Sequence, residues 1–240
     1  MHYQNFPAKV TKHTKQGVLK GENMFFKNLR EDIKAAKLND PAARNSFEIL
    51  LTYAGVHALS WHRVAYFFQK INMKLLARII SQLARFFTGI EIHPAAKIDG
   101  GVFIDHGSGV VIGETAEVHK GTAIYQGVTL GGTGKERGKR HPTIMENVTL
   151  SAGAKVLGGF TVGKGAKIGA GAVVLKEVPP YATVVGVPGR IVRIREPQAE
   201  DGVHSGIIAV KALNVEIDHE AEERAKEAAR LAEEERSSKK

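Results

Sequence analysis

The sequence contains no cysteine, which excludes disulfide bonds and thiolate metal sites. It has no apolar run near the roughly 20 residues that span a bilayer. Its first residues also lack the apolar core of a signal peptide. We therefore expect a cytoplasmic protein that does not enter a membrane, with 240 residues forming one large domain or two small ones.

The charge is unevenly distributed along the chain. The formal net charge is +9, although residues 216–240 carry an acidic excess, so the rest of the chain is more basic still. A basic excess can attract nucleic acid, a membrane or a polyanionic small molecule. The sequence shows no signature of a nucleic-acid-binding module. We therefore expect no nucleic-acid partner, and the basic excess is equally compatible with a polyanionic small molecule.

From Ile92 onward, aliphatic residues recur every six positions, a period that belongs to neither an isolated strand nor a helix. The phase slips by two after Val110, and the segment 131–143 separates two blocks. The positions are Ile92, Ile98, Ile104, Val110, Ile112, Val118, Ile124, Leu130, Ile144, Leu150, Val156, Val162, Ile168 and Val174. This period predicts a solenoid with three short strands in each coil, aliphatic side chains inside, and Gly or Asn at corners that need positive φ. A β-sandwich would instead alternate with period 2.

Upstream of the repeat, apolar residues follow helical spacing, as in Leu75, Ile79 and Leu83. Asp40 before Pro41 predicts a helix start, because Asp caps free amides and Pro suits the first turn. Gly89 predicts the end of the last helix. We expect the aromatic residues here, including Trp61, to lie in the core or in a subunit interface.

The interruption LGGTGKERGKRHPTI, residues 130–144, contains four glycines and four basic residues. Insertions in a solenoid project from its surface, often on a functional face. A flexible basic loop is often merely solvated. Its position beside the coil that carries Asp105 and His106 makes it a candidate part of a site.

Six segments together resemble the serine O-acetyltransferase family over about residues 31–192: IHPAAKI, IDHGSGVVIGETAEV, QGVTLGGTGK, KRHPTI, GAKIGAGAVV and VVGVPGRIV. The hexapeptide repeat alone is shared by many acyltransferases, whereas DHGSGVVIGET with GGTGK and RHP is much narrower. The resemblance implies a left-handed parallel β-helix, since general crossover chirality favours the right hand. It implies that the chain transfers the acetyl group of acetyl-CoA to the hydroxyl of L-serine, in cysteine biosynthesis.

The predicted fold class is α+β, an N-terminal α-helical region followed by a left-handed parallel β-helix of hexapeptide repeats. Residues 1–23 are expected to be disordered or an extension, because they are polar and lack periodicity. Residues 24–89 form the α-helical domain, 90–192 the β-helix catalytic domain, and 193–240 a tail that is partly helical.

Transfer of an acetyl group from a thioester to an alcohol needs a base that takes the hydroxyl proton. Histidine has an ordinary pKa suited to this near neutral pH, and His106 is the candidate. The resemblance implies that Glu91, where other members have Asp, fixes the imidazole of His106. Glu91 as a solvated carboxylate at a strand end is the alternative.

The resemblance also implies a site for the substrate's charged groups. Arg140 suits the serine carboxylate, because a guanidinium binds it through two hydrogen bonds. Asp40 and Asp105 accept from the ammonium, and His141 donates to the substrate or to the developing oxyanion. The alternative is that Arg140 and His141 only anchor the loop.

Acetyl-CoA, the expected co-substrate, needs small residues where its thin arm approaches the backbone. The candidates are Gly132, Thr133, Ala152 and Ala170, with Lys167 and Arg190 for the phosphates. The small residues have an equally good architectural explanation, since every coil contains such residues.

Two other enzyme classes share this kind of scaffold. A sugar or antibiotic acetyltransferase is disfavoured by Asp40, Asp105 and Arg140, which suit an amino acid. A metal-dependent lyase of the γ-carbonic anhydrase type is suggested by His93, His106, His119 and His141, although we expect no metal.

We expect a homotrimer or a dimer of trimers, with active sites between chains. Family members bind the next enzyme of the pathway, cysteine synthase, through a C-terminal isoleucine. This chain ends in Lys240, so we do not expect that complex.

Overall fold

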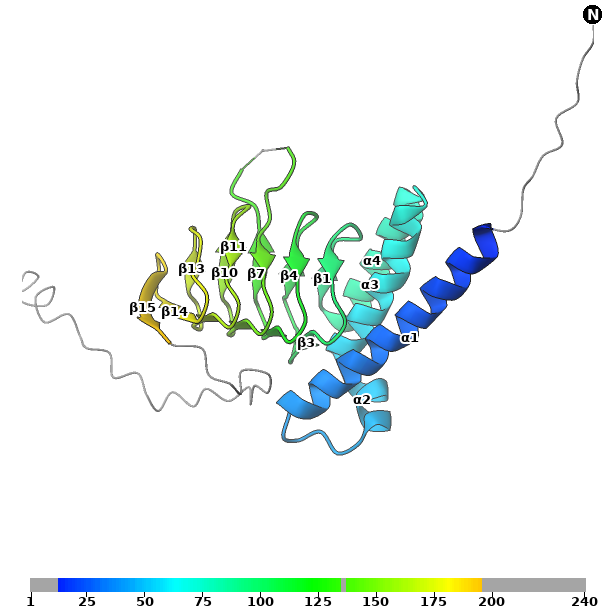
Figure 1. Cartoon of the computed structure of the whole chain (residues 1–240), viewed down its shortest axis with the longest axis horizontal. Helices are drawn as coiled ribbons and strands as arrows, with labels where there is room; N and C mark the ends of the chain where they lie inside the picture. The colour runs from blue at the N-terminus through cyan, green and yellow to red at the C-terminus, as the bar shows by residue number, and fades with distance from the viewer. Residues whose placement is uncertain (1–12, 135–136, 196–240) are drawn as a thin grey trace, which may run out of the picture. The chain divides into compact units, whose positions relative to one another are not determined.

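The structure, a computed structural model, describes residues 13–134 and 137–195, with side chains from residue 24 onward. Most of the predicted tail and residues 1–12 lie outside the described residues. Within the described part, four helices precede fifteen short strands (Figure 1). None of these helices is long and apolar enough to cross a bilayer.

The helices are α1 (His13–Asn39), α2 (Ser46–Thr52), α3 (Ala54–Lys70) and α4 (Lys74–Thr88). The predicted helix start at Asp40 is wrong. Asp40 Oδ1 accepts a hydrogen bond from Ala42 N at 2.8 Å and so closes a turn, whereas Asn45 caps α2 by accepting from Glu48 N. The predicted end of α4 is confirmed, with Gly89 in the left-handed region at φ 71.

The helical part of the chain starts earlier than the predicted boundary at Met24, because α1 already begins at His13. The residues before Met24 include several good helix formers, such as Lys, Gln, Leu and Glu. These formers outweigh the two glycines of the same stretch.

The strands form three sheets, and each coil adds one strand to each. The first sheet holds β1 (Glu91–Ile92), β4 (Val111–Ile112), β7 (Thr129–Gly131), β10 (Lys155–Leu157) and β13 (Val173–Val174). The second sheet holds β2 (Lys97–Ile98), β5 (Glu117–Val118), β8 (Thr143–Ile144) and β11 (Thr161–Val162). The third sheet holds β3 (Phe103–Ile104), β6 (Ala123–Ile124), β9 (Thr149–Leu150), β12 (Lys167–Ile168), β14 (Ala182–Val185) and β15 (Arg190–Ile194). Every strand pair is parallel except β14 with β15, so this part of the chain is a parallel β-helix.

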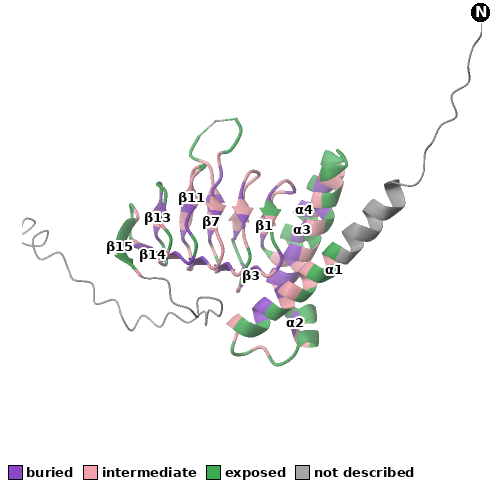
Figure 2. Ribbon diagram, viewed as in Figure 1, coloured by how far each residue is buried: buried purple, intermediate pink, exposed green. Residues whose placement is uncertain are grey.

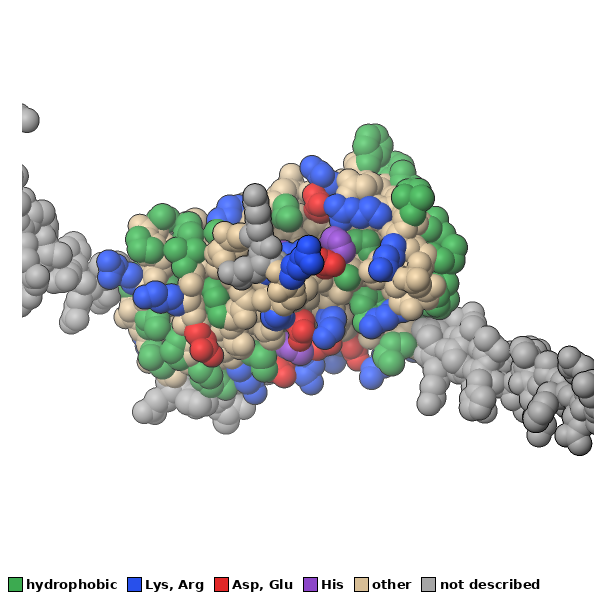
Figure 3. Space-filling model, turned by 90° about the horizontal axis from the view of Figure 1, so that it is seen from above, with side chains coloured by type: hydrophobic (Ala, Val, Ile, Leu, Met, Phe, Trp, Pro, Cys, Tyr) green, Lys and Arg blue, Asp and Glu red, His purple; other side chains and the backbone are tan. Residues whose placement is uncertain are grey.

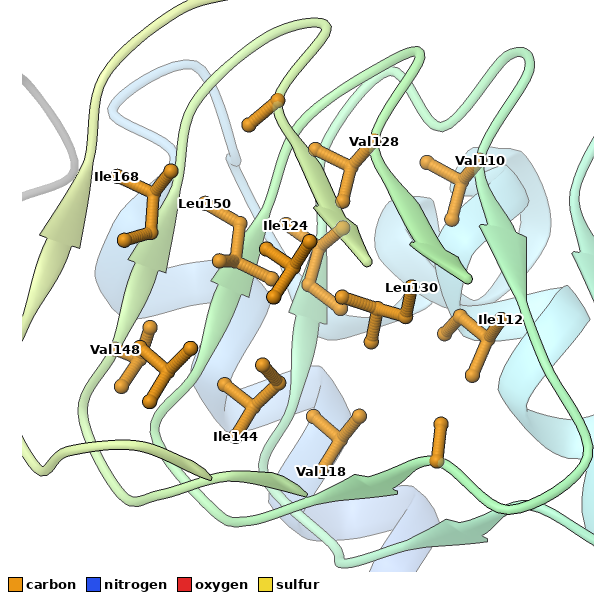
Figure 4. Close-up of a cluster of buried hydrophobic side chains, with 14 of the residues drawn as sticks. Val110, Ile112, Val118, Ile124, Val128, Leu130, Ile144, Val148, Leu150 and Ile168 are labelled. Carbon is orange, nitrogen blue, oxygen red and sulfur yellow. The ribbon is translucent and has the colours of Figure 1, made fainter. Parts of the chain in front are cut away.

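The six-residue period builds the core of the β-helix (Figures 2 and 4). The aliphatic residues of the period are buried, except that Ile98 is half-buried. Parallel pairing stacks equivalent positions of successive coils, as in Ile112 with Leu130. Full burial of such a side chain contributes about 1.5–3 kcal/mol, so the repeat itself supplies the stability of the solenoid.

Two corners matter for the site. The first corner connects the third sheet to the first and contains Gly109, Gly127, Gly153 and Gly171, all at positive φ. The second corner connects the first sheet to the second and contains Glu114 and Thr115; the insertion 131–143 leaves the next coil at this corner.

Helices α1, α2 and α3 cover the outer face of the third sheet at its first two coils. Phe103 and Ala123 pack there with Ala36, Ile49 and Val56. Helix α3 lies directly against β3, because a Cβ at Gly55 would overlap the carbonyl oxygen of Ile104. This contact places the loop after α1 and the junction of α2 with α3 near the first corner.

Many of the large apolar side chains of α2, α3 and α4, Trp61 among them, are exposed, so they do not belong to the core of this chain. They include Phe47, Leu51, Phe67, Leu75, Phe86 and Phe87. Figure 3 shows hydrophobic side chains along the edge formed by the helices. The subunit-interface alternative stays a prediction.

Candidate functional site

The first corner is longer between β3 and β4 than in later coils. Ile104 and Ile112 lie eight residues apart, whereas Ile124 and Leu130 lie six apart, which explains the slip in the period. His106 occupies this longer turn at φ 57, followed by Gly107 at φ 62. A left-handed conformation is uncommon for a residue other than Gly, and such residues concentrate at functional sites. The turn leaves the His106 side chain 75% exposed.

Asp105 lies beside this histidine, and Asp40 and Tyr53 lie near Asp105. His106 Nε2 is 3.8 Å from Asp105 Oδ1, and the pKa of Asp105 is raised by burial and by the charge of Asp40, although His106 opposes the rise. Tyr53 OH donates to Asp40 Oδ2 at 2.5 Å. The structure thus brings the predicted residues Asp40, Asp105 and His106 together, and we call them with Tyr53 the first-corner group.

Glu91 does not contact His106 in this structure. Its carboxylate pairs with Arg85 Nη1 at 3.0 Å and with Arg78 Nη2 at 3.9 Å, both on α4. The backbone segments of the two residues are nevertheless neighbours, because Gly109 N donates to Gly89 O at 3.0 Å. The predicted hydrogen bond between Glu91 and His106 is not formed in the described part of the chain.

Thr115 organises the second corner. Its hydroxyl oxygen accepts from the backbone N–H groups of Arg140 and His141, both at 3.0 Å. Its carbonyl oxygen accepts from Lys139 Nζ at 2.8 Å. Thr115 therefore holds the backbone at the end of the insertion, and this part of the anchor does not depend on the Arg140 side chain. We call Glu114, Thr115, Arg140 and His141 the second-corner group.

His141 is held as a neutral imidazole. Thr115 N donates to its Nδ1 at 3.2 Å, so the proton of the neutral ring lies on Nε2. Burial and the positive charge of Arg140 lower the pKa of His141, although Glu114 opposes this. A Cβ at Gly113 would overlap the ring, so glycine makes room for it. His141 can therefore donate a hydrogen bond through Nε2, as the predicted role requires.

Arg140 is paired with an acidic residue that sequence reasoning missed. Arg140 Nη2 donates to Glu114 Oε2 at 2.5 Å, and this contact lowers the pKa of Glu114. A guanidinium has five N–H donors, so others remain for a substrate carboxylate. Glu114 and Thr115 stand in the motif DHGSGVVIGETA, and their place directly after a strand was a signal for a corner. Tyr53 had no such signal, because it lies 13 residues from Asp40.

The two groups lie at opposite ends of the strands of the first sheet. Residues 107–113 lie between His106 and Glu114 along the chain, and the segment 110–114 spans about 13 Å where it is extended. No hydrogen bond or ion pair joins the groups among the described residues.

The expected acetyl-CoA residues divide in the same way. Ala152 and Ala170 belong to the first corner, where Gly171 N donates to Ala152 O at 2.9 Å. Gly132 lies at the base of the insertion, with its Cβ position 3.3 Å from Arg140 O, and the exposed Thr133 follows it. Lys167 is half-buried on β12 and Arg190 is exposed on β15, both in the third sheet.

The four histidines do not come together at one point, although His93 lies near the second-corner group and its charge acts on Glu114 and His141. His119 Nδ1 binds Asp99 Oδ2 at 2.9 Å, away from His106 and His141. His93 has a pKa lowered by burial and accepts from Ala95 N. Within residues 24–134 and 137–195, no three His, Asp or Glu side chains are placed to share a metal ion. The lyase alternative therefore lacks a ligand set in the described chain.

Two family models match the sequence. "Serine acetyltransferase, N-terminal" matches residues 1–60, and "Bacterial transferase hexapeptide (six repeats)" matches residues 141–176. The first match includes the stretch predicted as an extension. The second covers coils of the β-helix.

The chain is similar to named proteins over most of its length. It is 63% identical to "Serine acetyltransferase" of Bacillus pumilus over 169 residues, which cover 70% of this chain and 78% of the relative. It matches a Neisseria gonorrhoeae serine acetyltransferase solved with serine, at 40% identity and a TM-score of 0.70, covering 74% of this chain and 72% of that one. It also matches a serine acetyltransferase solved with CoA, at 42% identity and a TM-score of 0.69, covering 74% and 73%. The predicted fold, helices followed by a left-handed β-helix, is confirmed.

Proposed function

The chain belongs to the serine acetyltransferase family, and we propose that it transfers the acetyl group of acetyl-CoA to the hydroxyl of L-serine. The products are O-acetyl-L-serine and CoA, and the step belongs to cysteine biosynthesis. The observation that carries this proposal is the 63% identity over 78% of a relative of that name. The first-corner group, with His106 beside Asp105 and Asp40 near Asp105, gives the proposal a chemical basis.

His106 is the proposed general base. Its exposed imidazole takes the serine hydroxyl proton while the oxygen attacks the thioester carbonyl. The tetrahedral intermediate then breaks its carbon–sulfur bond, and the imidazolium returns the proton to the CoA thiolate. The left-handed turn supports this role, because it directs the side chain away from the coil.

Glu91 is the proposed partner of His106. A carboxylate that accepts from the imidazole fixes its tautomer and stabilises the imidazolium. The backbone contact between Gly89 and Gly109 keeps the two segments adjacent. The proposal requires the Glu91 side chain to turn from Arg85 towards His106 when serine binds.

The charged groups of serine divide between the two corners. Asp40 and Asp105 accept from the ammonium, and Arg140 binds the carboxylate. His141, neutral with its proton on Nε2, donates to the substrate or to the developing oxyanion. Asp105 and Arg140 lie at opposite ends of the strands of the first sheet, so the proposed site combines residues of two chains.

The proposed assembly is a homotrimer, alone or paired into a hexamer, in which the first corner of one chain faces the second corner of the next. The exposed apolar residues of α3 and α4 support assembly, because large exposed apolar patches mark interaction surfaces. Light scattering should give at least three times the 26.0 kDa of the chain. A monomer at micromolar concentration would contradict the assembly.

Acetyl-CoA is the proposed co-substrate. We propose that it lies between the first corner of one chain and the second corner of the next. Ala152 and Ala170 offer small side chains beside the first corner, and Gly132 and Thr133 lie at the base of the insertion. Lys167 and Arg190 are proposed to meet its phosphates. The cytoplasm is the proposed compartment, because a chain without cysteine suits a reducing environment without depending on it.

The test is an assay of thiol release from acetyl-CoA with L-serine, against a panel of sugars, aminoglycosides and other amino acids that carry hydroxyls. Serine should give the highest kcat/KM, and mass spectrometry should identify O-acetylserine. A higher kcat/KM for a sugar or an antibiotic would contradict the proposal and favour the other acetyltransferase class.

A further inference from the structure

Tyr53 connects the helical region to the first corner. It lies between α2 and α3, and its ring packs against the cluster of Ile49, Val56 and Phe103. Its hydroxyl donates to Asp40 Oδ2 at 2.5 Å. The ring is thus anchored in apolar packing, while the hydroxyl reaches the edge of the site.

The Asp40 carboxylate is held at both oxygens. Oδ1 accepts from Ala42 N at 2.8 Å within the turn, and Oδ2 accepts from Tyr53. Each carboxylate oxygen can accept two hydrogen bonds, so an ammonium can still bind. The contact with Ala42 alone fixes one oxygen and leaves rotation about the Oδ1 contact available. The contact with Tyr53 removes that freedom.

The need for such a tether follows from the neighbouring charge. The Asp40 charge acts on Asp105, where it adds to burial in raising the pKa. Two carboxylates near each other repel, and an untethered Asp40 would turn away towards water. Asp105 follows directly on the buried strand residue Ile104, whereas Asp40 lies in the turn after α1. Asp40 is therefore the group whose position needs support.

We propose that Tyr53 is a positioning residue for the serine ammonium: its hydroxyl holds the Asp40 carboxylate opposite Asp105, so that both carboxylates bind one cationic group. This inference rests on the proposed function, because it assigns the pair of carboxylates to serine. Tyr53 acts through Asp40 and does not touch the reacting atoms. The pKa of Tyr53 is raised to about 12 by burial and by Asp40, so its hydroxyl stays protonated and donates throughout the neutral range.

The first variant is Tyr53→Phe, which removes the hydroxyl and keeps the ring in its packing. We expect the KM for serine to rise about tenfold, as for loss of a hydrogen bond to a charged group. The kcat and the KM for acetyl-CoA should change less than about twofold, because neither the base nor the cofactor path is altered. Tyr66→Phe is the matched control, because Tyr66 lies on α3 and packs beside Lys70 and His62, away from Asp40.

A purely structural role for Tyr53 predicts a different pattern. Both KM values and kcat would worsen together, and the melting temperature would fall in parallel. That pattern, or an unchanged KM for serine, overturns the inference. Circular dichroism at the assay temperature identifies a variant that fails to fold.

The second measurement is a double-mutant cycle with Asp40→Asn. The amide keeps an oxygen for Ala42 N, but it replaces the oxygen that accepts from Tyr53. If Tyr53 acts through Asp40, Tyr53→Phe should change the serine KM by less than about twofold in the Asp40→Asn background. A tenfold rise in both backgrounds overturns the inference while the proposed function stands. Absence of serine-dependent thiol release from the unaltered protein overturns the proposed function and, with it, this assignment.

Discussion

Replacing Arg140 with lysine tests whether this residue binds the substrate carboxylate or only anchors the insertion. Lysine keeps the positive charge but loses the planar arrangement of N–H groups that binds a carboxylate through two hydrogen bonds. The backbone anchor is unaffected, because Thr115 accepts from the backbone N–H groups of Arg140 and His141. The substitution therefore separates the two roles more cleanly than alanine does.

The expected magnitude follows from the environment of the guanidinium. The Arg140 side chain is 29% exposed and is already bound to Glu114. A hydrogen bond to a charged group contributes about 1.5–3 kcal/mol, which corresponds to roughly a ten- to hundredfold loss in kcat/KM. The exposure argues for the lower end of that range, because water screens the interaction.

The assay compares L-serine with serinamide, which keeps the hydroxyl and the ammonium but lacks the carboxylate charge. The unaltered enzyme should prefer serine, and Arg140→Lys should reduce that preference by most of the same factor. The KM for acetyl-CoA should change little. An unchanged ratio of serine to serinamide would remove Arg140 from the site and weaken the case for an amino-acid substrate.

Thr115→Val is the matched control for the anchor role. Valine is nearly isosteric with threonine but cannot accept the two backbone hydrogen bonds. We expect both substrates to bind more weakly in this variant and protease cleavage between residues 131 and 140 to become faster. If Arg140→Lys gives the same pattern, anchoring is the main role of Arg140.

Three further predictions use the same assay with stability measurements. His106→Ala should lower kcat by about 10²–10⁴-fold with acetyl-CoA binding retained, and a variant that keeps more than roughly a tenth of the activity would make His106 structural. Asp105→Asn should raise the melting temperature at pH 7 and also raise the KM for serine. The stability gain follows because the pKa of Asp105 is raised in the folded state, so ionisation of Asp105 lowers the stability of the protein as pH rises. This gain should vanish below the ordinary pKa of aspartate, and a gain that persists there would contradict the reasoning. Gly113→Ala should lower kcat/KM and the melting temperature, because its Cβ overlaps the His141 ring, and an unchanged enzyme would show that the ring can move away at no cost.

The six-residue period predicted the coils because it is a property of the local chain, and each aliphatic position is buried by the same parallel stacking. The helix start was missed because Asp40 and Asn45 carry equivalent capping side chains, and the turn after α1 decides which one is used. The exposed aromatics were ambiguous for a related reason, since helical spacing identifies an apolar face and not what covers it.

Sequence motifs identified the candidate site residues but not their grouping. Asp105 and Arg140 belong to one predicted site, yet the coil geometry places them at opposite ends of the strands of the first sheet. Tyr53 could not be found from the sequence, because its contact with Asp40 depends on how α2 and α3 meet the third sheet. Local patterns are readable in the sequence, and contacts between distant segments require the fold.

In the proposed assembly, each chain carries two separate half-sites, one at each end of the strands of the first sheet. A chain with His106→Ala retains an intact second-corner group, and a chain with Arg140→Ala retains an intact first-corner group. When the two variants are refolded together at equal amounts, one of the three junctions in each mixed trimer joins an intact first corner to an intact second corner, which is about a quarter of the junctions over all trimers. The mixture should then show more activity than either variant alone, which is intersubunit complementation. If the site were built within one chain, mixing the variants would restore no activity.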